Sequence, residues 1–444
     1  MITGGTKMQH LRTTFAASIV VFTVVCSLQG GAGSTRAGAA TTGSTSPQWV
    51  ASWAASPSDD SFPIDPTLDL IPGVWVNQTI RDIITPHLGG SELRIHLSNR
   101  FSSSPTTFGH VTIGYQVGGA NASETTNVTF GGSNSVTVAA GQDVVSDPVT
   151  FSFAAFEPLA VSIYMPGVPG SITKHWNANA TSYYTITASG DKTNQWSGAD
   201  YLSSAASWFY LDGLDVVASV PTRSIVAFGD SITDGFIGGS AISLPESATA
   251  TNANGRYPDD LQRRLNAAGI PISVINAGIA DNQLLTSGSL SGPSGLSRLS
   301  EDALSKPGVV GVLILEGIND LGQGGATPAT MEAGFAQAIS EVHAAGLKIW
   351  LGTILPASNS LPDGTSAAPN SEIYREEINA WILSQNLADG VVDFDAALRN
   401  PAVPSQLAPQ YASVDNLHPN LAGYQEMANI IPLSLLSATN VPAE

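Results

Sequence analysis

The sequence predicts two consecutive architectures, an all-β sandwich or jelly roll over residues 48–220 and an α/β domain over residues 221–444. Before Pro221, short runs alternate apolar and polar residues, which is the period of a half-buried antiparallel strand. After Pro221, short apolar runs alternate with longer amphipathic segments, which favours a parallel sheet with helices on both faces. The chain has 444 residues, enough for two domains with substantial cores.

The first 39 residues are predicted to be a signal peptide for secretion. Lys7 and Arg12 precede an apolar run at residues 15–25, and residues 37–39 read Ala-Gly-Ala, a small-residue cleavage site; Met8 is an alternative start. The apolar run is too short to span a bilayer comfortably, and no later stretch has about 18 uninterrupted apolar residues, so no membrane anchor is expected. We therefore expect a secreted, extracellular protein.

Cys26, the only cysteine, lies inside this signal. A lipid-modified Cys26 is the alternative, but Val25 stands where a small residue would be expected before such a cysteine. With cleavage after Ala39 the mature chain has no cysteine, so it can use neither disulfides nor a thiol nucleophile. Residues 40–47 are Ala, Thr, Gly, Ser and Pro, and this composition predicts a flexible linker.

The chain is strongly acidic. It has 36 Asp and Glu residues against 17 Lys and Arg residues, a formal net charge of -19. Lys7, Arg12 and Arg36 are basic and the predicted signal contains no acid, so its removal brings the net charge to -22. Such a charge opposes binding to nucleic acid or to an anionic membrane. A neutral or acetylated substrate fits better.

Four stretches before Pro221 show the clearest alternation. They are residues 92–97 (ELRIHL), 110–115 (HVTIGY), 135–138 (SVTV) and 160–164 (AVSIY). Gly, Asn, Ser and Pro punctuate the intervals, so the strands are expected to be short and joined by turns. This pattern is typical of a sandwich or jelly roll, here of about 170 residues.

After Pro221, apolar runs and amphipathic segments follow one another. The predicted strands are residues 224–228, 272–275, 309–315, 347–351 and 391–394, and the predicted helices include residues 257–268, 327–345, 371–386 and 420–435. Apolar runs without polar alternation suit strands that are buried on both faces. In such a sheet, functional residues lie beyond the carboxyl ends of the strands.

Residues that suit ester hydrolysis follow these strands. Ser231, Gly278 and Asn319 come after the first, second and third predicted strands, and Asp415 and His418 lie in a loop before the last predicted helix. A serine hydroxyl needs a base, which His418 can supply while Asp415 orients its imidazole. The N–H groups of Ser231 and Gly278 and the amide of Asn319 can form an oxyanion hole. The alternatives are a turn at Gly278, a loop cap at Asn319 and a helix cap at Asp415.

Neighbouring acids and other histidines are interpreted as structural. Asp230, Asp234 and Asp320 are expected to accept backbone N–H bonds and to hold the loops. A glycosidase pair of Glu316 with Asp320 would leave the serine and histidine unexplained. Five further histidines show no metal-ligand spacing, so neither a metal nor a cofactor is expected; they are His87, His96, His110, His175 and His343.

Four sequence blocks resemble the GDSL, or SGNH, hydrolase family over residues 223–435. They are residues 229–231 (GDS), 276–278 (NAG), 317–320 (GIND) and 415–418 (DNLH). The resemblance implies a flavodoxin-like three-layer αβα fold, a catalytic triad of Ser231, Asp415 and His418, and an oxyanion hole of Ser231, Gly278 and Asn319. Ile232 stands where the family often has Leu, and Thr233 replaces the second Gly of the Gly-x-Ser-x-Gly motif of common α/β-hydrolases.

Longer stretches narrow this resemblance. Residues 276–282 (NAGIADN), 292–299 (GPSGLSRL) and 315–320 (LEGIND) look like the bacterial branch that includes acylhydrolases encoded beside xylan-degrading enzymes, and residues 49–53 (WVASW) are similar to the start of the β domain that precedes many of them. The resemblance implies a serine esterase for short acyl or acetyl esters, with acylated polysaccharide among the candidate substrates. A lipase or phospholipase of the same mechanism and a non-catalytic carbohydrate-binding protein are the alternatives.

Overall fold

A computed structural model of the protein describes residues 48–59, 75–240, 245–246, 249–288, 292–323, 325–357 and 370–437. Residues 47–444 form one compact unit, which holds a strand-rich region followed by an α/β region. The predicted signal peptide and linker, residues 1–47, lie outside the described residues. Within the described part of the chain, no helix is long and apolar enough to cross a membrane.

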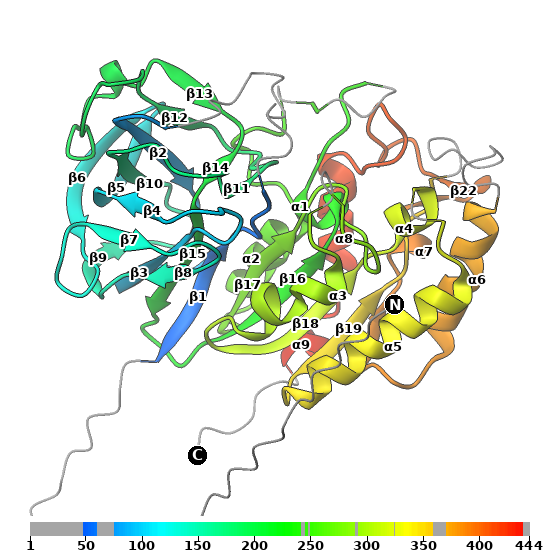
Figure 1. Ribbon diagram of the computed structural model, residues 1–444. Helices are drawn as coiled ribbons and strands as arrows, with labels where there is room; N and C mark the ends of the chain where they lie inside the picture. Colours follow the sequence, from blue (N-terminus) through cyan, green and yellow to red (C-terminus); the bar gives the residue numbers. More distant parts are fainter. Residues whose placement is uncertain are drawn as a thin grey trace, which may run out of the picture. The chain divides into compact units, whose positions relative to one another are not determined.

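Two antiparallel sheets dominate the strand-rich region (Figure 1). The first has the order β1-β15-β3-β8, with β9 also paired to β3; its strands are β1 (Trp49–Ala54), β15 (Leu211–Val217), β3 (Gly90–Ser98), β8 (Asp143–Val145) and β9 (Val149–Phe153). The second has the order β13-β12-β2-β10-β5-β6; its strands are β13 (Ser203–Ala205), β12 (Ser182–Tyr184), β2 (Gln78–Ile84), β10 (Leu159–Met165), β5 (His110–Gly118) and β6 (Asn121–Val128). Two short pairs accompany them, β4 (Thr106–Phe108) with β7 (Val136–Val138) and β11 (Lys174–His175) with β14 (Trp208–Phe209).

Side chains from both sheets share one apolar core. Ile95 of β3 and Ile163 of β10 are fully buried in the same cluster. In β3 the burial alternates, as the sequence predicts, because one face of the strand meets this core. In β10 the burial does not alternate, because Arg81 of β2 covers the other face and donates to Ser162 Oγ at 2.8 Å. A strand with two covered faces cannot keep the period-two pattern of exposure.

The α/β region is built on a five-stranded parallel sheet of order β17-β16-β18-β19-β20 (Figure 1). Its strands are β16 (Arg223–Gly229), β17 (Ile272–Gly278), β18 (Val309–Leu315), β19 (Lys348–Gly352) and β20 (Gly390–Val392). In chain order this is 2-1-3-4-5, the flavodoxin-like order. Most positions of β16, β17 and β18 are buried. The parallel sheet predicted from the continuous apolar runs is therefore confirmed.

Two groups of helices accompany this sheet (Figure 1). The first comprises α2 (Tyr257–Ala267), α7 (Phe394–Leu398) and α8 (Leu421–Ile430), and the second comprises α3 (Gly295–Leu299), α5 (Pro328–Ala344) and α6 (Ser371–Ser384). Short helices directly follow β16 and β18, namely α1 (Ser231–Asp234) and α4 (Ile318–Gly322). The remaining elements are η1 (Gly198–Asp200), η2 (Ser300–Leu304), β21 (Arg399–Asn400), β22 (Val403–Leu407) and α9 (Leu433–Ser437).

The helix predicted at residues 420–435 is two helices. Its first part, α8, has Asn420 as N-cap, with the Asn420 side chain accepting the Gly423 N–H. Its second part, α9, begins only after Pro432. Proline has no N–H and disfavours helical backbone at the residue before it, and Ile431 is accordingly extended, with φ -68° and ψ 115°.

The strand-rich region and the α/β region touch through buried polar contacts. The Ala51 N–H of β1 donates to Pro307 O, just before β18, at 3.0 Å. His87 Nε2 lies 2.9 Å from Asp259 Oδ1 on α2. Only residues 218–222 separate β15 from β16. Buried contacts of this kind, with so short a connection, hold two regions together rather than leaving them on a flexible tether.

Candidate active site

Ser231 begins a short helix at the carboxyl end of β16. Asp230 is the N-cap of α1, and its side chain accepts the Ile232 N–H at 2.9 Å. This contact turns the chain from strand to helix within two residues. Ser231 therefore occupies the first helical position, where a backbone N–H has no partner inside the helix.

Ser231, His418 and Asp415 form a continuous hydrogen-bond chain. His418 Nε2 lies 2.8 Å from Ser231 Oγ, and His418 Nδ1 lies 2.7 Å from Asp415 Oδ2. All three residues are buried, with exposed fractions of 6% for Ser231, 5% for His418 and 2% for Asp415. The structure thus brings together, from two distant segments, the three residues that the sequence predicts as a triad.

Asp415 and His418 lie in a loop before α8, as the sequence predicts. Because Asn420 is the N-cap of α8, helix capping does not explain Asp415. Asp415 Oδ1 instead accepts the backbone N–H groups of Leu417 and His418, each at 3.0 Å, and the Ser413 hydroxyl at 2.7 Å. These three donors leave Oδ2 for the imidazole.

The Asp415 carboxylate is held in its ionised form. Burial alone would raise the pKa of Asp415, but the hydrogen bond and charge of His418, with the Ser413 hydroxyl, hold that pKa well below its usual range. Gly238 makes room for this arrangement, since a Cβ at that position would overlap Asp415 Oδ2. An ionised carboxylate at this place can fix the imidazole tautomer and stabilise an imidazolium.

The Gly278 N–H, predicted as an oxyanion donor, is already engaged. It donates to Asn276 Oδ1 at 2.8 Å. The next N–H along the strand, that of Ile279, donates to Gly229 O of β16 at 3.0 Å. Because successive N–H groups of a strand point to opposite sides, the Gly278 N–H points to the side away from β16, the strand that leads to Ser231. A Cβ at Gly278 would overlap the Asp234 backbone, so the glycine allows α1 to pack closely, and this geometry does not support it as the donor.

A different N–H, in the loop after β17, is better placed. Asp281 has φ +68°, a left-handed conformation that Asp tolerates better than most residues, and its N–H has no hydrogen-bond partner among the described residues. Burial raises the pKa of Asp281, and the charge of His418 is close enough to oppose that rise. The sequence pattern did not single out Asp281 as a functional residue, although an Asp-Asn pair after a strand is a turn signal.

Asn319 lies in the first turn of α4, directly after β18. Its Nδ2 donates to the carbonyl of Asn282, the neighbour of Asp281, at 2.9 Å. An amide nitrogen carries two hydrogens, so one N–H is left beyond this bond. The bond fixes the Asn319 side chain against the same loop that presents the Asp281 N–H.

Three buried acids, Asp230, Glu316 and Asp320, lie close enough to one another to interact through their charges, and Asp230 directly precedes Ser231. Burial raises the pKa of Asp230 to about 7. Burial, together with the charge of Asp230, also raises the pKa of Glu316 well above its usual value. Asp320 accepts the N–H groups of Leu284 and Leu285 at 2.8 and 2.9 Å, the loop-holding contact expected of it. A glycosidase pair needs two carboxylates across a cleft, and the burial of Glu316 and the backbone contacts of Asp320 argue against one.

Two residues of the strand-rich region contact the side chain of Asp234, the last residue of α1. His175 Nε2 lies 3.0 Å from Asp234 Oδ1, and Asn177 Nδ2 donates to Asp234 Oδ2 at 3.0 Å. Burial lowers the pKa of His175, but the charge and hydrogen bond of Asp234 raise it by more, so the pKa of His175 lies above its ordinary value. A histidine that the sequence analysis placed among structural residues therefore anchors the helix that carries Ser231.

The other histidines singled out in the sequence pair with single acids. The pairs are His87 with Asp259, His96 with Asp215, His110 with Asp191 and His343 with Asp389. In the part of the chain that the structure describes, no cluster of three or more His, Cys, Asp or Glu side chains is arranged to hold a metal ion.

One aromatic ring contacts the His418 imidazole, and a second ring stacks on the first. The Phe236 ring centroid lies 4.6 Å from that of His418, at an interplanar angle of 49°. Trp176 stacks on Phe236 at 6.3 Å and 15°. Phe236 follows α1, whereas Trp176 belongs to the strand-rich region, so both regions contribute to the surroundings of the base.

Residues 227–426 match the GDSL-like Lipase/Acylhydrolase family. This GDSL-like segment contains Ser231, Asp281, Asn319, Asp415 and His418, and the strand-rich region lies outside it. A comparison with curated protein sequences gave no match.

Several solved structures are similar to about half of the chain. The inhibitor-bound aryl esterase of M. smegmatis is 16% identical, with 47% of this chain and 95% of that chain covered and a TM-score of 0.38. Est24, a carbohydrate acetylesterase from Sinorhizobium meliloti, is 15% identical, with 47% and 95% covered and a TM-score of 0.38. A GDSL-like lipase from Bacteroides thetaiotaomicron is 20% identical, with 49% and 89% covered and a TM-score of 0.35.

Proposed function

We propose that the protein is a serine acylhydrolase that cleaves carboxylic esters through an acyl-enzyme intermediate. The observation that carries the proposal is the hydrogen-bond chain from Ser231 Oγ through His418 to Asp415. A serine hydroxyl is a weak nucleophile, and a neutral imidazole nitrogen 2.8 Å away can take its proton as the oxygen attacks. The match of residues 227–426 to the GDSL-like Lipase/Acylhydrolase family supports this chemistry.

We assign the oxyanion hole to three donors around the nucleophile. They are the N–H of Ser231, the N–H of Asp281 in place of that of Gly278, and the free amide hydrogen of Asn319. The Asn319 bond to Asn282 supports this grouping, because it ties the amide to the Asp281 loop. Donors that are fixed before the reaction need no reorganisation, and each typically lowers the barrier by about 3 kcal/mol.

The two half-reactions then use the same base. As Ser231 Oγ attacks the ester carbonyl, His418 takes its proton and the ionised Asp415 stabilises the imidazolium. The imidazolium donates the proton to the departing alcohol, which leaves the acyl group on Ser231. A water molecule, activated by the neutral imidazole, releases the acid and restores the hydroxyl.

We further propose that the enzyme is secreted and acts on short acyl or acetyl esters, with acylated polysaccharide among its substrates. Secretion rests on the signal pattern of residues 1–39. The net charge of -19 favours neutral substrates over anionic surfaces. The partly exposed ring of Trp176, which stacks on the Phe236 ring next to His418, suits packing against an aryl or sugar ring.

The proposal is tested by replacing the nucleophile. Ser231→Ala should lower kcat on p-nitrophenyl acetate by about 10⁴-fold or more without changing the melting temperature. A fluorophosphonate should label the wild type at Ser231 and leave the variant unlabelled. Ser224→Ala is the matched control, because Ser224 is likewise a buried serine, but it lies within β16 and its hydroxyl donates to Pro307 O, away from the triad. Residual activity above a tenth of wild type would contradict the assignment.

Two further measurements separate the finer alternatives. A crystal structure of the phosphonylated enzyme should place the phosphoryl oxygen within hydrogen-bond distance of Ser231 N, Asp281 N and Asn319 Nδ2; contact with Gly278 N would restore the original assignment. Rates on acetate, butyrate and longer aryl esters, on acetylated xylan and on phospholipid should be highest for the short esters. A preference for long chains would indicate a lipase, and binding of xylan without turnover would indicate a carbohydrate-binding protein.

A further inference from the structure

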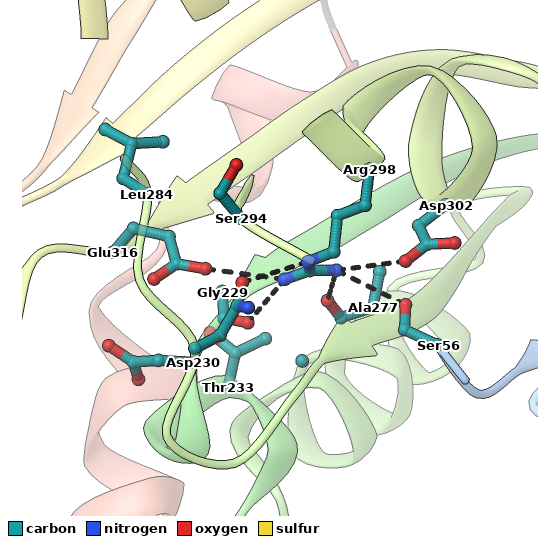
Figure 2. Close-up of polar contacts among 12 residues, drawn as sticks. Ser56, Gly229, Asp230, Thr233, Ala277, Leu284, Ser294, Arg298, Asp302 and Glu316 are labelled. Atoms are coloured by element: carbon teal, nitrogen blue, oxygen red, sulfur yellow. Dashed lines mark hydrogen bonds and ion pairs between the residues drawn. The ribbon is translucent and has the colours of Figure 1, made fainter. Parts of the chain in front are cut away.

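Arg298 of α3 is buried beside Gly229, the residue from which the chain turns through Asp230 to Ser231 (Figure 2). Only 2% of its side chain is exposed. Its guanidinium carbon lies 3.9 Å from the centroid of the Phe228 ring, which belongs to β16. None of the steps of the proposed reaction uses this cation, so its role has to be found in what it holds.

The guanidinium binds the carboxyl ends of two neighbouring strands (Figure 2). Nη2 donates to Gly229 O, at the end of β16, at 2.8 Å. Nη1 donates to Ala277 O, near the end of β17, at 2.7 Å. Gly229 also accepts the Ile279 N–H, so its carbonyl joins β16, β17 and Arg298 at one point. The turn to Ser231 begins directly after this carbonyl.

The third donor of the side chain reaches the loop that carries the Asp281 N–H, and this loop also accepts the Asn319 amide. Arg298 Nε donates to Asn282 Oδ1 at 2.9 Å. Asn282 directly follows Asp281, and the Asn282 carbonyl accepts the Asn319 amide. One planar group therefore contacts the nucleophile turn on one side and the Asp281 loop on the other.

We propose that Arg298 is a positioning residue that sets the spacing between Ser231 and the other two oxyanion donors. This inference rests on the proposed function, because spacing matters only if these donors act on one oxygen. A shift of about 1 Å in such groups can cost about 10²-fold in rate. Five donors in a rigid fork make Arg suited to holding three acceptors at once, which the point charge of Lys cannot do.

The strand-rich region helps to place this guanidinium. Asp302 Oδ2 accepts from Arg298 Nη1 at 3.3 Å, and Asp302 Oδ1 accepts from Arg100 Nη1 at 2.9 Å. Ser56 Oγ accepts from Arg298 Nη1 at 3.4 Å. Burial would raise the pKa of Asp302, but Arg298, with further cations, holds that pKa below its ordinary value, so the buried cation has an ionised partner. Arg100 and Ser56 belong to the strand-rich region.

Glu316 does not compete with Asp302 as the counter-ion. It lies 3.4 Å from Arg298 through Oε1, and Oε2 has no partner among the described residues. Burial and the neighbouring charge of Asp230 raise the pKa of Glu316 well above its usual value, whereas the pKa of Asp302 is lowered, so Asp302 is the better ionised partner for the guanidinium. The bridge from Arg100 through Asp302 to Arg298 is thus the ionic connection between the two regions at this point.

The test compares two lysine substitutions in the full chain. Arg298→Lys should lower kcat per active site about 30-fold and change KM less than about threefold, because the misplaced donors act on charge that appears only in the transition state. Active sites are counted by fluorophosphonate titration, so that unfolded protein does not enter the rate. Arg81→Lys is the matched control: Arg81 is equally buried, donates to Ala120 O and Gln195 O, and lies over the Tyr201 ring, all within the strand-rich region. It should lower stability and leave kcat per site unchanged.

Asp302→Asn is the second variant, for the case that Arg298→Lys yields no titratable sites. It keeps Arg298 but weakens its anchor, and should lower kcat per site about threefold to tenfold. An unchanged kcat per site in Arg298→Lys overturns the inference, as does an equal fall in Arg81→Lys; if Arg298→Lys does not fold, an unchanged Asp302→Asn overturns it. A wild-type protein that neither hydrolyses esters nor reacts with the phosphonate would instead overturn the proposed function.

Discussion

Replacing Asp415 with Asn should invert the tautomer of the catalytic histidine. The donors on the Oδ1 side, which come from Ser413, Leu417 and His418, require an acceptor there. In Asp415→Asn the amide oxygen must occupy that side, so the amide NH₂ group faces His418 Nδ1. An NH₂ group donates and does not accept, so Nδ1 must become the acceptor and the ring proton moves to Nε2. That proton then points at Ser231 Oγ, 2.8 Å away, and the base cannot take the serine proton.

The expected loss follows from this geometry. A wrong tautomer in a triad of intact shape lowers kcat by about 10⁴-fold, or about 5.5 kcal/mol of barrier. The fold should survive, because the substitution preserves size and three of the four hydrogen bonds of the side chain. The assay is kcat and KM on p-nitrophenyl acetate together with thermal unfolding.

A second carboxylate provides the control. Asp393→Asn alters the N-cap of α7, whose carboxylate accepts the Ala396 N–H and the Thr353 hydroxyl, each at 3.0 Å, and it should leave kcat within about twofold. If Asp415→Asn retains more than a tenth of the wild-type kcat, Asp415 does not fix the tautomer and the reasoning fails.

Three shorter predictions concern charge and the oxyanion hole. Asn319→Ala should lower kcat by about 10² to 10³-fold with little change in KM, and a loss confined to KM would make Asn319 a ground-state binder. The folded-state pKa of His175 is raised, so its pair with Asp234 stabilises the fold fully below pH 6.5 and less as pH rises through that pKa; the melting-temperature gap between wild type and His175→Gln should therefore be larger at pH 6 than at pH 9.5. The folded-state pKa of Glu316 is also raised, so wild-type stability falls as pH rises from the unfolded value near 4.5 towards the folded value, and Glu316→Gln should gain stability relative to wild type as pH rises above about 5. A pH-independent difference in either melting comparison would contradict the charge assignment.

The regular elements could be predicted because their signals are local. Continuous apolar runs before polar turns mark β16 to β19, and the alternation in residues 92–97 marks β3. The sequence alone could have predicted two helices within residues 420–435, because Pro432 interrupts a helix there. Strand β10 could not be foreseen as buried on both faces, because its second cover comes from Arg81, which is distant in sequence.

The sequence predicted which side chains gather at the site, but it predicted only in part which backbone N–H groups can serve as donors there. Ser231, Asp415 and His418 carry their chemistry in the side chain, so their order in the chain was informative. The proposed oxyanion donors include backbone N–H groups, which every residue but proline possesses. Only the structure shows that the Gly278 N–H is bonded to Asn276, whereas the Asp281 N–H has no hydrogen-bond partner among the described residues. The pairing of His175 with Asp234 depends on contact between the two regions, about which neither local sequence gives a signal.

The contacts across the two regions bear directly on the nucleophile. Asp234 takes two side-chain partners, His175 and Asn177, from the strand-rich region, and Asp234 lies on the helix that begins with Ser231. Asp302 accepts hydrogen bonds from Arg100, which belongs to the same region, and from Arg298. A buried carboxylate that loses its partner destabilises the fold by several kcal/mol, and water or neighbouring groups move in to replace the lost partner.

A fragment of residues 221–444 should therefore be impaired even on a small ester that needs no contact with the strand-rich region. It would keep the five residues of the proposed triad and oxyanion hole. It would, however, leave Asp234, at the end of α1 and three residues from Ser231, without its partners His175 and Asn177. We expect a lower melting temperature and a kcat on p-nitrophenyl acetate, per titrated site, at least about tenfold below that of the full chain. His175→Gln in the full chain should move both quantities in the same direction by a smaller amount, because Asn177 still contacts Asp234. A fragment that melts and turns over like the full chain would show that the α/β region holds its own active site and that the strand-rich region is only attached to it.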